Sequence, residues 1–307
     1  MIGFFLNSVV WLIAAVAVVY LASFVAHWSH QRFAKRAKGK PSRTLPRSEP
    51  PTALDQLFAP LEREHSGQSG LLSLFEDADA FAARSVSAQL AGRSLDLMYY
   101  FWSADLTGWL LARDLLNAAD RGVRVRLLLD DAHVSGLDTI YLTLSRHPQI
   151  EVRLFNPTRI RGNTLHRAIE LLLGLARFNR RMHCTTWIAD GRLAILGGRN
   201  IDDAYFGAAD AGKANTRDAD IMLVGPEVTQ VETVFDEYWN SDLALPIAKL
   251  SPNLRVNLKA LRNRFSRKAK STRALAFNSQ TVGTQDSAAI LTKRLRWTCL
   301  LYTSDAA

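Results

Sequence analysis

The sequence predicts an α/β fold, a mixed and largely parallel sheet flanked by helices, preceded by one transmembrane helix. Residues 1–31 contain no Asp, Glu, Lys or Arg. Residues 2–26 are almost all apolar, which is long enough for a helix to cross a bilayer. After residue 70, short apolar runs alternate with segments of helical spacing. This alternation is typical of an α/β layer with helices on both faces of its sheet.

Residues 1–31 are predicted to be a membrane anchor. A cleaved signal peptide is the alternative, but such a peptide has a basic start and a shorter apolar stretch, whereas this N-terminus is uncharged. Residues 32–47 carry seven basic residues and no acidic one. Positive charge beside a span favours the cytoplasmic side for the rest of the chain.

Two basic segments account for the formal net charge of +9. They are residues 32–47 and residues 255–273, and the second carries eight bases and no acid. The rest of the chain is net acidic, which gives no support for a broad surface that binds polyanions. We therefore predict no nucleic-acid partner. The two cysteines do not define a disulfide framework.

The folded part is expected to begin after a basic, proline-rich linker at residues 32–65. Apolar residues at helical spacing predict helices, and short runs rich in aliphatic and aromatic residues predict buried strands. The predicted order is helix 71–90, strand 95–102, helix 106–119, strand 123–129, helix 139–145 and strand 150–155. A site is expected at the carboxyl ends of such strands. Asp130 and Asp131 either border that site or cap the next turn.

A hairpin is predicted within residues 183–200, HCTTWIADGRLAILGGRN. Asp190-Gly191 lies between two apolar runs, as in a tight β-turn. The returning strand then brings Asn200 close to His183.

One face of this hairpin should carry His183, Thr185 and Asn200, because alternate strand residues share a face. Gly197 and Gly198 would let a ligand approach the backbone amides closely. Cys184 should point to the opposite face, which argues against a thiol nucleophile or metal ligand beside the histidine.

The pattern resembles the phospholipase D superfamily, whose motif reads His, any residue, Lys, four residues, Asp, then a glycine-rich stretch ending in Asn. His183, Asp190, Gly197, Gly198 and Asn200 match, and Thr185 stands in place of the lysine. The resemblance runs from about residue 70 to 245 and is greatest to the membrane-bound bacterial cardiolipin synthases. It includes LMYYFW at 97–102, LLLDD at 127–131, VRLFNP at 152–157, NIDDAYFG at 200–207 and YWNS at 238–241.

The resemblance implies that His183 attacks the phosphorus of a phosphodiester, forming a phosphohistidine that an alcohol or water resolves. Asn200 would hold a non-bridging oxygen, and Asp218 would orient the histidine. Asp190 completes the motif, although its position favours a turn-forming role. Thr185 offers a hydroxyl without charge, a loss of ~3 kcal/mol or about a hundredfold in rate. The remaining residues expected to contact substrate are Gly197, Gly198 and Arg199.

The implied activity is that of a phosphatidyltransferase acting on glycerophospholipids, with neither cofactor nor metal. Its substrates would be phosphatidylglycerol-like lipids or phosphatidylethanolamine, and its location the bacterial inner membrane. One alternative is a hydrolytic phospholipase D or other phosphodiesterase. Another is a non-catalytic, membrane-bound domain that binds phospholipid and has decayed at Thr185.

Residues 66–250 are predicted to form the first half of a catalytic domain, because the sequence contains no second such motif. The second half is expected either elsewhere in a longer chain or from a homodimer. Residues 251–296 would be a basic inter-domain segment whose leucines either lie on an anionic membrane or belong to a solvated linker. Residues 297–307 fit no expected element and are interpreted as a non-native tail.

Overall fold

The computed structural model describes residues 2–47, 50–134, 136–210, 212, 214–251, 254–282 and 287–300. Its sheet has nine strands in the order β8-β4-β3-β2-β5-β6-β7-β1-β9. The strands are β1 (Ser69–Leu74), β2 (Ser94–Tyr99), β3 (Arg124–Asp130), β4 (Ile150–Phe155), β5 (Thr185–Ala189), β6 (Leu193–Gly197), β7 (Asp220–Val224), β8 (Ala244–Pro246) and β9 (Arg296–Thr298). A mixed sheet flanked by helices is confirmed.

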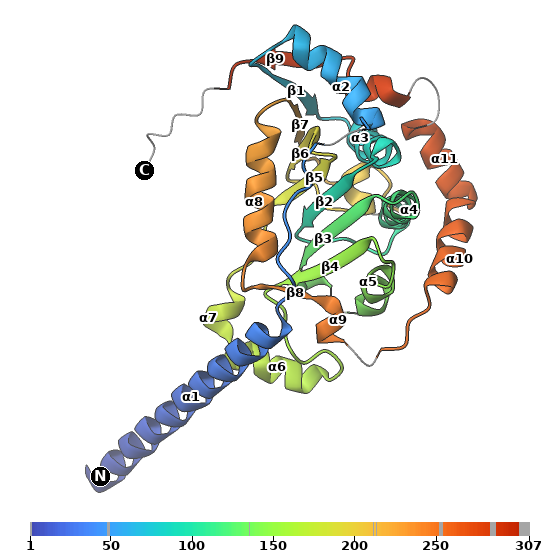
Figure 1. Cartoon of the computed structure of the whole chain (residues 1–307). Coiled ribbons are helices and arrows are strands. Elements are labelled where there is room, and N and C mark those ends of the chain that lie inside the picture. The colour runs from blue at the N-terminus through green and yellow to red at the C-terminus, as the bar shows by residue number, and fades with distance from the viewer. Residues whose placement is uncertain are drawn as a thin grey trace.

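The helices lie in layers on either side of this sheet (Figure 1). They are α1 (Ile2–Ala37), α2 (Ala53–Glu64), α3 (Asp77–Leu90), α4 (Leu106–Asp120), α5 (Asp138–Leu144), α6 (Thr164–Leu173), α7 (Leu175–Phe178), α8 (Val228–Asn240), α9 (Ile247–Leu250), α10 (Leu258–Ala269) and α11 (Thr272–Thr281). Helix α8 covers one face, α3, α4 and α5 cover the other, and α10 and α11 form an outer layer beyond them.

The expectation that the sheet is largely parallel is wrong. Only β2, β3 and β4 run parallel to one another, and the other strand pairs are antiparallel. One cause is the β5–β6 hairpin, which joins neighbouring strands by a tight turn and so makes them antiparallel. The other is β1, which pairs with β7. It occupies the first part of the segment predicted as helix 71–90.

Both faces of the sheet are buried. The larger core lies under α3, α4 and α5 and includes Leu97, Leu127 and Trp187. The smaller core lies under α8 and includes Met98, Leu128 and Trp239. Neighbouring residues of β2 and β3 therefore enter opposite cores, which explains why these strands are apolar throughout.

Helix α1 projects from the body (Figure 1). Within it, Val9–Ala37 is long and apolar enough to cross a membrane. Its most apolar stretch of 18 residues has a mean hydropathy of 2.6, and none of that stretch is buried inside the protein. The helix continues past residue 31 to Ala37. Arg32, Lys35 and Arg36 therefore belong to the same helix as the apolar run and not to a linker.

The remainder of the expected linker is ordered against the sheet. Residues 38–47, here called the strap, run in extended form beside α8 (Figure 1). Arg153 donates to the carbonyl of Lys40 at 2.6 Å, and Arg126 donates to the carbonyl of Ser42 at 3.1 Å. Buried arginines of β3 and β4 thus hold the strap by its backbone.

Helix α2 also contradicts the prediction of an irregular linker up to residue 65. Thr52 and Asp55 form a capping box at its start. Leu54 and Phe58, one turn apart, are fully buried. The capping pattern Thr-x-x-Asp was present in the sequence, but the surrounding prolines obscured it.

The segment predicted as inter-domain, residues 251–296, packs on the body. Leu261 and Phe265 of α10 are buried, and the Phe265 ring lies 5.5 Å from that of Trp109 on α4. Both alternatives for this segment are therefore wrong, because its apolar face is covered by protein. Of the predicted non-native tail, Trp297 and Thr298 pair with β1, while residues 301–307 lie outside the described residues.

Candidate active site

The predicted hairpin is confirmed. Thr185 pairs with Gly197 and Ala189 with Leu193 along antiparallel β5 and β6. Asp190 and Gly191 form the turn with φ values of 53° and 63°, and Arg192 N donates to the Ala189 carbonyl at 2.9 Å. Two consecutive positive φ values define a type I′ turn, which matches the twist of the flanking strands.

His183 lies two residues before β5, at the edge of the sheet where the parallel strands end. Its side chain is exposed, and its ring packs against Tyr100 with centroids 4.6 Å apart. Met182, immediately before it, is fully buried under α8. His183 is thus an accessible imidazole on a segment whose preceding residue is fixed in the core.

Asp130, at the end of β3, holds that segment. Its buried carboxylate accepts from Met182 N at 2.9 Å and from the Arg181 guanidinium at 3.2 Å. It also accepts from Ala132 N at 2.9 Å, so it both borders the site and caps the following turn. Burial raises the pKa of this carboxyl, although these donors oppose the rise. Asp130 therefore acts as a positioning residue for His183.

Asn200 lies at the same edge. Its side-chain oxygen accepts from Phe101 N at 3.1 Å, and the neighbouring Ile201 pairs with Trp102. Tyr100 contacts His183 and Phe101 contacts Asn200. The hairpin and the loop after β2 thus place His183 and Asn200 against two consecutive residues, Tyr100 and Phe101.

The two glycines give this edge an open backbone. Gly197 and Gly198 are exposed. A Cβ at Gly198 would lie 2.5 Å from both carboxylate oxygens of Asp218, and one at Gly197 would overlap Asp220. Asp218 is half-buried directly against Gly198. At Gly197 a side chain would also meet the backbone of Ala219 and Asp220, so only glycine fits there, whereas at Gly198 it would displace the Asp218 carboxylate.

Thr185 does not project into this open edge. It is 4% exposed, and its hydroxyl donates to the carbonyl of Gly197 across the hairpin. A hydroxyl has one proton to donate, so in this arrangement Thr185 has none left for a phosphate oxygen. The expected donor role of Thr185 is not supported by its geometry.

Arg199 is also unsuited to the substrate contact expected of it. Its side chain is fully buried. The guanidinium donates to the carbonyls of Leu74 and Phe75, each at 2.7 Å, and pairs with Asp77 at 3.0 Å. These bonds tie the returning strand to the end of β1 and leave Arg199 inaccessible to a ligand.

Asp190 lies at the far end of the hairpin from His183, seven residues or up to about 23 Å away by strand rise. It is fully buried, and its carboxylate accepts from the backbone N–H groups of Gly92, Arg93 and Ser94 at 2.9, 2.7 and 2.9 Å. The turn-forming interpretation is therefore favoured over proton transfer, and the carboxylate joins the hairpin to the start of β2.

Replacing Asp190 by Ala should lower the free energy of unfolding by about 3 kcal/mol, because three backbone donors, two of them buried, lose their acceptor. Urea titration of the chain in detergent micelles measures this. Asp218→Ala is the matched control, since within the described part of the chain the half-buried Asp218 accepts a hydrogen bond from its neighbour Ala219 N alone. Its effect should stay below about 1 kcal/mol. Equal effects of the two substitutions would contradict the assignment.

A second histidine lies at the same edge of the sheet, outside the motif. His133 is exposed, and its ring lies 4.7 Å from Tyr100 and 5.4 Å from Phe101. It lacks the motif that follows His183, and its only sequence signal was its position just after Asp130-Asp131 at a strand end. The two imidazoles contact the same Tyr100 ring.

The loop after β2 contains a half-buried carboxyl group, that of Asp105. Burial raises the pKa of Asp105 to about 7, and the neighbouring carboxylates of Asp203 and Asp202 add to the rise. The N–H groups of Asp203 and Gly108 oppose it. Asp105 caps α4 and holds the segment that follows Asn200.

This carboxyl should make the chain less stable as pH rises. An unfolded aspartate ionises near pH 4, so between about pH 4 and pH 7 the folded chain retains a proton that the unfolded chain has lost. The free energy of unfolding should fall by roughly 2 to 4 kcal/mol across that window. Asp105→Asn should flatten the slope in urea titrations at successive pH values, and an unchanged slope would refute this.

Comparison with known proteins identifies the family. A family model described as cardiolipin synthase, PLD-like domain, matches residues 87–239. Cardiolipin synthase C of Escherichia coli is 46% identical over 191 residues, covering 62% of this chain and 39% of that protein. A cardiolipin synthase of Oceanobacillus iheyensis is 28% identical over 174 residues, covering 56% of this chain and 34% of that protein.

Among solved structures, NucT from Helicobacter pylori has a TM-score of 0.42 and 16% identity, covering 58% of this chain and 98% of that one. The chain spans about two fifths of the length of cardiolipin synthase C. The resemblance found in the sequence is confirmed. Residues 87–239 form a phospholipase D-like domain, and the chain belongs to the cardiolipin synthase group of the phospholipase D superfamily.

Proposed function

We propose that this chain supplies the nucleophilic half of a membrane-anchored phosphatidyltransferase. The observation that carries the proposal is the accessible His183 at the edge of the sheet where Gly197 and Gly198 are exposed and Asp218 lies against Gly198. The substrates would be glycerophospholipids of the phosphatidylglycerol type or phosphatidylethanolamine, and the product a cardiolipin-like lipid.

In the first step an imidazole nitrogen of His183 bonds to the phosphorus of the donor lipid. The bond from phosphorus to the headgroup oxygen breaks, and an acid protonates that oxygen. In the second step the hydroxyl of an acceptor lipid loses its proton and bonds to phosphorus, which releases the imidazole. With water as acceptor the same steps give hydrolysis, so access of the acceptor decides between transferase and phospholipase D.

Each neighbour has a role in these steps. Asn200 would hold a non-bridging oxygen with its amide N–H, because its carbonyl oxygen is already occupied by Phe101 N. Asp218 would orient the imidazole from beside Gly198. The acid would come from a second histidine motif, in a further domain or a second copy of the chain. His133 is the nearest alternative, since it contacts Tyr100.

The membrane anchor is the second part of the proposal. Helix α1 would span the bacterial inner membrane with the folded body on the cytoplasmic side. Its apolar run and the bases that follow support that orientation. The lipid substrates and the site would then share one membrane surface.

A covalent intermediate tests this function directly. The chain, together with the second motif that completes the site, is incubated with phosphatidylglycerol labelled with ³²P and quenched with base, in which phosphohistidine persists. We expect label on the wild-type protein and on a Cys184→Ser variant, but none on His183→Ala. Equal labelling of all three proteins would refute His183 as the nucleophile.

A second candidate function is a non-catalytic domain that binds phospholipid. Thr185 favours it, because threonine carries no charge where the motif has a cation that neutralises the phosphate. Its hydroxyl is also already bonded to the Gly197 carbonyl. The substitution Thr185→Lys distinguishes the two functions.

A further inference from the structure

Helix α6 exposes the apolar face that a helix of a soluble protein would bury. Leu165, Ile169 and Leu172 lie at positions i, i+4 and i+7, on one side of the helix. Their side chains are 70%, 46% and 67% exposed. No residue of this ten-residue helix is buried.

The charged residues of α6 point toward the protein instead. The Glu170 carboxylate accepts from Arg159 N at 2.8 Å and from Ile160 N at 2.9 Å. The Arg167 guanidinium lies 3.5 Å from the buried carboxylate of Asp131. In a soluble protein charged residues face water and apolar residues face the core. The reversed arrangement indicates that the outer face of α6 meets an apolar medium.

The position of α6 identifies that medium. Helix α6 lies beside the part of α1 that joins the body (Figure 1). Arg159, just before α6, donates to the Ser29 hydroxyl at 3.4 Å, and its guanidinium lies 5.2 Å from the Phe33 ring. Ser29 and Phe33 belong to the end of the segment that can span a membrane. The apolar face of α6 therefore lies where α1 would leave the bilayer.

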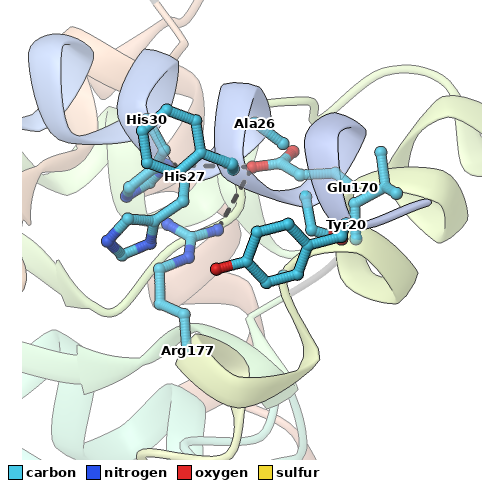
Figure 2. Close-up of a pocket in the computed structure, with 10 residues that line it drawn as sticks. Tyr20, Ala26, His27, His30, Glu170 and Arg177 are labelled. Carbon is cyan, nitrogen blue, oxygen red and sulfur yellow. Dashed lines mark hydrogen bonds and ion pairs between the residues drawn. The ribbon is translucent and has the colours of Figure 1, made fainter. Parts of the chain in front are cut away.

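A cavity of about 260 Å³ separates α1 from α6 and α7. Figure 2 shows Tyr20, His27 and His30 entering it from α1, opposite Glu170 and Arg177. Arg177 pairs with Glu170 at 3.4 Å, but its buried Nη1 has no hydrogen-bond partner among the described residues. Burial lowers the pKa of Arg177 to about 10. A guanidinium with an unused donor, placed where α1 would leave the bilayer, is suited to bind a lipid phosphate.

We propose that α6 is an interfacial helix that lies in the surface of an anionic phospholipid leaflet, with Leu165, Ile169 and Leu172 among the acyl chains. The inference rests on α1 as the anchor and does not require catalysis. It gives the body a second membrane contact, so that the body cannot turn freely about α1. The chain leaves α6 through α7 and reaches His183 within five residues of Phe178, which would hold the active-site edge near the membrane surface.

Lipid contact can be measured residue by residue. Cys184 and Cys299, the only cysteines, are replaced by serine in the full chain. Single cysteines are then introduced as Leu165→Cys or Leu172→Cys and labelled with nitrobenzoxadiazole. Leu275→Cys on α11 is the matched control, because Leu275 is 58% exposed on a helix far from α1 (Figure 1). Leu12→Cys reports on the span itself.

The labelled chains are reconstituted in vesicles of phosphatidylcholine and phosphatidylglycerol that contain lipids with nitroxide on the acyl chain. We expect about twofold quenching or more at positions 165, 172 and 12, and little at position 275. Positions 165 and 172 behaving like position 275 would overturn the inference, as would absence of quenching at position 12. A blue shift without quenching would also overturn it, since protein and not lipid would then cover α6.

The His183→Ala variant of each labelled chain should be quenched to the same extent. Loss of catalysis therefore leaves this readout unchanged, and failure of the proposed function can be told apart from failure of this inference.

Discussion

Replacing His183 by Ala should reduce formation of cardiolipin-like product by at least ~10³-fold, because the reaction loses its nucleophile. The fold should be unaffected, since the His183 side chain is exposed and its closest described contact is the Tyr100 ring. The measurement is lipid product analysis of membranes containing the protein together with whatever second motif completes the site.

Cys184→Ser is the matched control for this substitution. Cys184 is the adjacent residue and is also exposed, with its sulfur 3.9 Å from the Tyr238 hydroxyl. It should retain activity within about twofold, because a surface residue outside the reaction is replaced by an isostere. Unchanged product in the His183→Ala membranes would refute phosphatidyl transfer at this site and leave lipid binding as the better account.

Thr185→Lys should raise the rate of transfer by ~10²-fold. A lysine side chain, unlike that of Thr185, is long enough to extend from this position into the open edge and to neutralise the phosphate as negative charge develops on it, a stabilisation of ~3 kcal/mol. The Thr185 hydroxyl now donates to the Gly197 carbonyl and carries no charge. The measurement is the initial rate of product formation at saturating lipid.

Thr185→Met separates charge from size, because Met is about as long as Lys and is neutral. It should give no increase in rate, and since Thr185 is only 4% exposed both substitutions should disturb packing to a similar degree. If the lysine variant is no faster than the methionine variant while vesicle binding persists, the site is a non-catalytic phospholipid-binding one.

The β5–β6 hairpin was predictable because Asp190-Gly191 dictates its own turn, whatever lies around it. That residues 71–74 belong to a strand was not predictable, because Leu71 to Leu74 suits a helix as well as a strand. Only pairing with β7 makes this segment β1. Helix α2 was missed because its stability comes from burying Leu54 and Phe58 against distant segments.

The candidate site divides in the same way. His183, Asn200 and the two glycines were identified from spacing along one hairpin. Asp130 and His133 lie about 50 residues from His183 in the chain, and only the sheet brings them to its edge. Arg199 matched a substrate-contact pattern, yet its guanidinium is bonded to carbonyls at the end of β1.

By itself the sequence determined the segment that is long and apolar enough to cross a membrane, the hairpin and the residues of its motif, because each depends on neighbours within about thirty positions. The tertiary structure alone decided that Thr185 is turned to the Gly197 carbonyl, that Asp190 holds the start of β2, and that α6 presents its leucines outward. The physical reason is that hydrogen-bond partners and burial are set by residues far apart in the chain, which no local pattern contains.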